Sequence, residues 1–164
     1  MRVFRSLLLF KLGFWAGMMA AAAFVKRAVP SRGDEDSDEL ALVAVMDGIE
    51  LTNRSKAFKG GPMVAWYGGI AVDLREAELA PDARLSVRTL FGGIAIRVPP
   101  TWRIESSVTA LAGGVDAGTP AQDDPDAPVL VVEGRALFGG VAVGTKAEAA
   151  MSEPAARVAE PAAE

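Results

Sequence analysis

Residues 85–98 read LSVRTLFGGIAIRV, and this stretch decides the fold. On both sides of the Gly-Gly pair, apolar residues alternate with polar or small ones, which is the period-two pattern of a half-buried β-strand. Before the glycines, the odd-numbered residues 85–89 are expected to face one way and the even-numbered residues 84–88 the other. The stretch therefore predicts two strands that are joined at a glycine corner.

The same phrase of an aromatic residue, two glycines and a β-branched residue returns along the chain. It stands at residues 67–70, 91–94 and 138–141, in degraded form at residues 112–115, and more weakly at residues 47–49. The glycine before the aliphatic residue recurs at steps of 21, 24, 21 and 26 residues, a period that is typical of stacked repeats. We therefore predict an all-β fold: a repeat-based β-solenoid-like domain preceded by one N-terminal transmembrane helix.

The predicted corners need backbone conformations, or close approaches between backbones, that a β-carbon forbids. The corner residues are Gly68, Gly69, Gly92, Gly93, Gly113, Gly114, Gly139 and Gly140. On this interpretation Gly93→Val unfolds the domain, and the three aromatic residues of the phrase stack at the corner within the core. An aromatic binding strip is the alternative for these three residues. A Gly-Gly hairpin turn, which would give an antiparallel meander or sandwich, is the alternative. Near-identical residues at equivalent places favour stacked repeats.

Composition excludes much chemistry. The 164 residues include neither cysteine nor histidine, which removes disulfides, the usual zinc and haem ligands, and the Ser-His and Cys-His catalytic pairs. Residues 1–33 carry a charge of +6 and the other 131 residues carry −10. An acidic domain argues against nucleic acid as a partner, whereas basic residues that flank an apolar segment indicate a membrane.

Four segments follow from these patterns. Residues 1–29 are predicted to be a membrane anchor, residues 30–39 an acidic and solvated linker, residues 40–145 the β-repeat domain, and residues 146–164 a disordered tail rich in Ala, Glu and Pro. The apolar run at residues 7–25 is long enough for a single span if Lys11 reaches toward the headgroups. A cleaved signal peptide and a helix lying in the interface are the alternatives.

The acidic residues do not form a catalytic pattern. Asp73, Glu76 and Glu78 alternate as a solvated edge would, and the other acids lie mostly in predicted linkers and turns. We therefore expect no enzyme activity, no catalytic residues, no metal site and no cofactor. Clustered carboxylates of the kind that cleave polysaccharides are the alternative.

Three stretches carry a family resemblance. ALFGGVAV at residues 136–143, LSVRTLFGGIAIRVPPTWRIE at residues 85–105 and VDLREAEL at residues 72–79 resemble the C-terminal domain of LiaF-like proteins, which are described as cell-wall-active-antibiotic response proteins of the toast-rack type. The resemblance implies a membrane protein that modulates an envelope-stress two-component system. LiaF proteins carry a multi-helix membrane region, whereas this chain has one candidate span.

These observations predict a non-enzymatic, membrane-tethered regulatory or sensing module, held in the cell membrane by a single pass. Its expected partners are the membrane and a protein, either a sensor kinase or an envelope component. The alternative is a structural scaffold that resembles bactofilins and self-associates at the membrane.

Overall fold

The computed structural model describes residues 30–118 and 124–145, together with six isolated residues before them. Within the described residues 31–118 and 124–145, the domain contains seven strands and no helix. The strands are β1 (Leu42–Val45), β2 (Gly48–Thr52), β3 (Phe58–Trp66), β4 (Gly68–Asp73), β5 (Leu79–Arg97), β6 (Arg103–Ala117) and β7 (Val129–Gly144).

Every pair of named strands is parallel, so the chain winds in coils and does not double back in hairpins. The marker glycines of all five repeats lie in one column across the sheet. In the order of the stack, this column is Gly48, Gly69, Gly93, Gly140 and Gly114. The predicted all-β, solenoid-like stacking is confirmed, and the antiparallel alternative is wrong.

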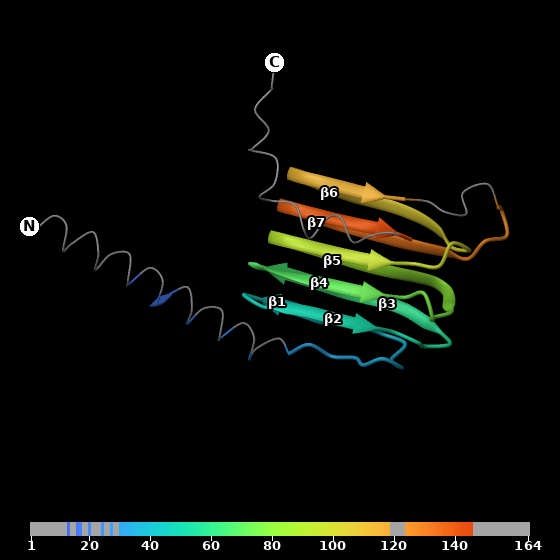
Figure 1. Ribbon diagram of the computed structural model, residues 1–164, viewed down its shortest axis with the longest axis horizontal. Helices are drawn as coiled ribbons and strands as arrows, with labels where there is room; N and C mark the ends of the chain where they lie inside the picture. The colour runs from blue at the N-terminus through green and yellow to red at the C-terminus, as the bar shows by residue number, and fades with distance from the viewer. Residues whose placement is uncertain are drawn as a thin grey trace, which may run out of the picture. The chain divides into compact units, whose positions relative to one another are not determined.

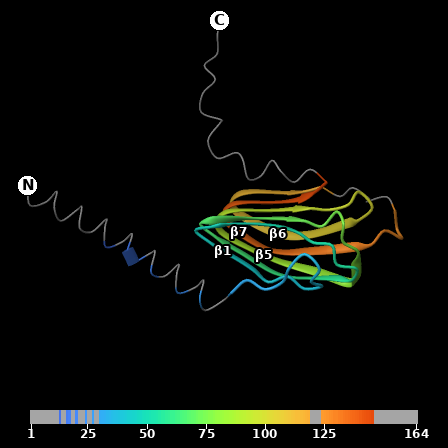
Figure 2. The ribbon, with the colours of Figure 1, turned by 60° about the horizontal axis from the view of Figure 1, so that its bottom comes forward.

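Each coil has a first leg before the corner and a second leg after it. The strands β1 and β3 and the beginnings of β5, β6 and β7 are first legs; β2, β4 and the ends of the three long strands are second legs. In Figure 1 the second legs run parallel to one another in front of the first legs. Figure 2 shows the same two layers after a turn of 60° about the horizontal axis.

The core lies between the two legs. Leu85 and Val87 from the first leg of β5, and Ile94 and Ile96 from its second leg, are fully buried in one apolar cluster. The side-chain alternation predicted for residues 84–89 is confirmed, because the odd-numbered residues are buried. Burying a side chain of this size stabilises the fold by about 1.5–3 kcal/mol before the loss of conformational entropy is counted.

The order of the stack departs from the order of the sequence. Strand β7 pairs with β5 on one side and with β6 on the other, so the fifth repeat is inserted between the third and the fourth (Figure 1). The degraded repeat, with Ala112 in the aromatic position, therefore lies at the end of the stack. The intact repeat of β7 stacks Phe138 on Phe91 of β5.

At the corners of β5, β6 and β7, the first glycine of the pair is the one that no other residue can replace. Gly92 has a φ of 147°, and a β-carbon there would lie 1.9 Å from the carbonyl oxygen of Gly68. Gly113 and Gly139 repeat this arrangement. Gly93 does not have a positive φ, so the reason predicted for Gly93→Val is wrong and applies to Gly92 instead.

The aromatic residues of the repeats form a ladder along the corner. The ring centroids of Tyr67 and Phe91 are 4.5 Å apart, and those of Phe91 and Phe138 are 4.8 Å apart. The predicted stacking is confirmed, but the predicted place in the core is wrong. The three residues are 41%, 37% and 48% exposed, because the corner turns their side chains outward.

Residues 31–39 are joined to the first coil. Arg32 and Ala41 exchange two backbone hydrogen bonds, and the Ser31 hydroxyl accepts one from the backbone N–H of Val43 at 2.9 Å. These contacts cover part of the outer edge of β1. Unpaired backbone groups on a strand edge invite pairing with another chain, so the cover protects this end of the stack.

A buried asparagine holds the acidic segment in place. The side-chain amide of Asn53 donates to the backbone oxygens of Ser37 and Asp34, at 2.9 and 3.3 Å. A hydrogen bond from the Ser37 hydroxyl lowers the pKa of Asp34. The predicted solvated tether at residues 30–39 is exposed to solvent at most positions, yet its backbone is fixed by these contacts.

The N-terminal segment forms a unit of its own, Met1–Pro30. Its described residues Gly13, Ala16, Gly17, Ala20, Phe24 and Arg27 are helical and exposed. Among the described residues, no helix has both the length and the apolar character needed to cross a bilayer. Most of the predicted anchor and all of the predicted tail at residues 146–164 lie outside the described residues.

Candidate functional site

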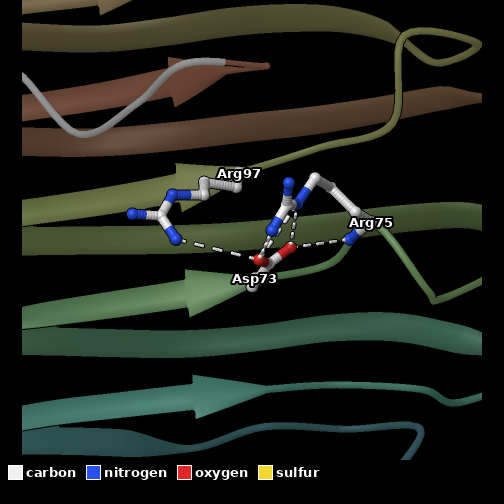
Figure 3. Close-up of polar contacts among 3 residues, drawn as sticks. All are labelled: Asp73, Arg75 and Arg97. Atoms are coloured by element: carbon white, nitrogen blue, oxygen red, sulfur yellow. Dashed lines mark hydrogen bonds and ion pairs between the residues drawn. The ribbon is translucent and has the colours of Figure 1, made fainter.

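The predicted solvated edge contains one well-ordered ion-pair cluster. Asp73, at the end of β4, accepts hydrogen bonds from the backbone N–H of Arg75 at 3.1 Å and from its guanidinium at 2.6–3.0 Å. Arg97 approaches the same carboxylate at 3.8 Å (Figure 3). The Arg75 hydrogen bonds lower the pKa of Asp73. A carboxylate held in the ionised form in this way closes a turn and is a poor proton donor.

Asp73→Asn is expected to destabilise the domain by about 1 kcal/mol at neutral pH, since Arg75 is more than half exposed and solvent screens the pair. Because the folded-state pKa is lowered, the charge contributes fully above the ordinary value of 3.8. The contribution disappears as the pH falls through the lower folded-state value. Thermal unfolding of the parent and the variant across this range measures the effect. A difference that stays constant at acid pH would contradict it.

The other carboxylates of the edge do not join Asp73. Glu78 pairs with Lys56 at 2.9 Å, and Glu76 is exposed. In the described ranges 30–118 and 124–145, no three Asp or Glu side chains come close enough to hold a metal ion. Glu76 and Glu78 thus lie on the surface as predicted, whereas Asp73 is mostly buried.

The corner glycines determine how closely neighbouring coils approach. Gly68, Gly92, Gly113 and Gly139 allow neighbouring coils to approach, since a β-carbon on any of them would come within 2.2 Å of a backbone oxygen. Gly69, Gly93, Gly114 and Gly140 belong to the marker column. Both sets of glycines keep the coils in register at the corner, and the register places the aromatic residues on top of one another.

The outer side of the first legs carries a hollow. A shallow hollow of about 1000 Å³ lies over β3, β5, β7 and β6. Trp66, Leu90 and Leu137 line the part of it that is nearest to the corner. Leu137 is 40% exposed, and the buried Nε1–H of Trp66 has no acceptor among the described residues. We call this surface the first-leg face.

A basic pair lies one step further from the corner on the same face. Arg88 of β5 and Arg135 of β7 are in register, with Val64 and Thr109 as the next residues on either side. Both arginines are exposed, and both line the hollow. Sequence reasoning placed Arg88 on the outer face but missed its partner. The signal was present, because residues 88–93 read RTLFGG and residues 135–140 read RALFGG.

Comparison with known proteins adds nothing to the site itself. No protein-family model matches the chain, and neither the curated proteins nor the solved structures provide a match. The resemblance to LiaF-like domains therefore stays a prediction.

Proposed function

We propose that this chain is a non-enzymatic, membrane-tethered module that regulates or senses the state of the cell envelope, in the manner of LiaF-type modulators. The observation that carries the proposal is the first-leg face. There a parallel sheet presents the exposed Leu137, the half-exposed aromatic ladder and two arginines together. Such a surface suits binding, because exposed apolar patches mark interaction sites.

The test is genetic. Deleting the gene is expected to change the transcription of envelope-stress genes when the host meets a cell-wall-active antibiotic. Leu137→Ser, which alters only an exposed position, should reproduce the deletion without lowering the amount of protein. Glu50→Gln, at an exposed position on β2, is the matched control and should leave the response unchanged. A response that survives the deletion would overturn the proposal.

A self-assembling scaffold is the second candidate, and one feature favours it. Strand β6 pairs with β7 on one edge only, and no other described strand pairs with its remaining edge over Arg103–Ala117. An open edge of this length can recruit a second chain. Sedimentation across a dilution series distinguishes the two readings. Species that grow with concentration favour a scaffold, and a monodisperse monomer favours the regulatory module.

A further inference from the structure

The first-leg face is organised in rows that run across the strands. Nearest the corner lies an apolar row of Trp66, Leu90 and Leu137, beside the half-exposed aromatic ladder. The next row carries the in-register pair Arg88 and Arg135. The face therefore passes from an aromatic and apolar edge to a row of positive charge within one step of the strand pleat.

The arginine pair is unfavourable for the isolated fold. In-register residues on adjacent strands lie about 4.8 Å apart at the backbone, and like charges facing each other across a pair of strands are destabilising. Neither arginine forms an ion pair with any described residue. On the same face, Arg84 pairs with Glu133 at 3.0 Å, so the sheet offsets a charge there but not at the arginine pair.

A bound anion would offset the repulsion. Arginine binds phosphate groups through paired N–H donors, and two neighbouring guanidiniums can share one such group. The neighbouring rows fit a ligand whose anionic head joins an apolar body. Aromatic side chains favour the boundary between lipid headgroups and acyl chains, and arginines just above such a boundary keep their charge in the headgroup layer.

We propose that the first-leg face binds the phosphate groups of anionic phospholipids, so that the aromatic corner of the domain lies against a membrane surface. Each arginine near an anionic surface strengthens membrane binding by only about five-fold, which is weak for a free protein. The inference rests on the proposed function for the tether, because a tethered domain meets the membrane at an effective concentration near the millimolar range. The acidic charge elsewhere in the domain is screened beyond about 8 Å at physiological ionic strength.

The test uses the full chain, whose lack of cysteine lets one introduced thiol be labelled alone. Leu137→Cys carries an environment-sensitive dye, and Glu50→Cys on β2 is the matched control. Each protein is reconstituted into phosphatidylcholine vesicles with or without phosphatidylglycerol. We expect an aqueous quencher to act at least about two-fold less well on the dye at position 137 when phosphatidylglycerol is present, and high salt should reverse this. The control dye should not change.

Arg135→Glu supplies the second arm. In detergent, without anionic lipid, this variant should melt a few degrees above the parent, because a carboxylate would then face Arg88. In vesicles it should abolish the protection of the dye at position 137. Lys59→Glu, at an exposed position of β3, changes the net charge equally and should leave the protection in place.

Each outcome decides one point. A chain that fails to float with vesicles of either composition contradicts the tether and hence the proposed function. A chain that floats but shows equal quenching with and without phosphatidylglycerol overturns the lipid-binding face alone. Protection by inorganic phosphate in phosphatidylcholine vesicles would instead identify a soluble anion as the ligand and would overturn the lipid assignment.

Discussion

Gly92→Val is expected to leave the domain unfolded at room temperature. The β-carbon of any residue at position 92 would lie 1.9 Å from the carbonyl oxygen of Gly68, a backbone atom that pairing with β5 holds in place. The φ of 147° is also strained for a residue with a side chain. Relief would require the two coils to separate at the corner, so the loss should exceed about 4 kcal/mol.

Circular dichroism and thermal unfolding of the purified variant measure this loss. Gly114→Val is the matched control, because no atom lies within 4 Å of the β-carbon that position 114 would gain. The control should unfold within about 1 kcal/mol of the parent. If the Gly92→Val protein melts cooperatively within a few degrees of the parent, close approach of the backbones does not explain the first glycine of the pair.

The repeat was readable from the sequence because stacking places equivalent residues on one another. Ile49, Ile70, Ile94, Val141 and Val115 lie in one column beside the marker glycines. Each coil must bury the same face, so the same residue types return at the same places. Period-two alternation then determined which side chains point inward, and the burial of Leu85 and Val87 agrees with it.

The backbone conformation at each corner, and the direction of the aromatic side chains there, could not be predicted from the sequence. Two consecutive glycines predict a corner, but the sequence does not show which of the two has the positive φ. In the first two coils the turn is made differently, with Met46 and Tyr67 each at a φ of 53°. The aromatic residues were expected in the core because each repeat has a single one, and the outward turn of the chain at the corner leaves no local pattern in the sequence.

The contacts that fix the backbone of the acidic segment could not be predicted from its charge, which indicates only a solvated linker. Its contacts to the domain are made largely by backbone atoms and by Asn53, a residue that stands outside the segment. Such partners lie 16 and 19 residues away in the sequence. The composition of the segment does not predict these partners, because only the fold brings Asn53 next to the segment.

The order of the coils was not predicted from the sequence, and it concealed the arginine pair. Repeats that are adjacent in a sequence usually are adjacent in space, and nothing in this sequence indicates another order. With β7 between β5 and β6, Arg135 comes into register with Arg88, and Thr109 of β6 lies beyond it. The third and fifth repeats share the sequence pattern R-x-L-F-G-G. Once the order of the stack is known, this pattern indicates that Arg88 and Arg135 are neighbours.

This order makes a second strong prediction. Val141 and Val115 are equivalent in the repeat, yet Val141 of β7 is 1% exposed and Val115 of β6 is 37% exposed. Val141→Asp would bury an unpaired carboxylate between two coils and should cost at least about 3 kcal/mol. Val115→Asp places the same charge at the end of the stack, where water reaches it, and should cost less than about 1 kcal/mol.

Thermal and denaturant unfolding of the two variants provide the comparison, and each variant serves as the control for the other. If the coils followed the order of the sequence, β6 would lie inside the stack and β7 at its end. The carboxylate at position 115 would then be the damaging one, and the ranking of the two variants would reverse. Because the substitutions are chemically identical and occupy equivalent repeat positions, the sign of the difference depends only on which strand has neighbours on both sides.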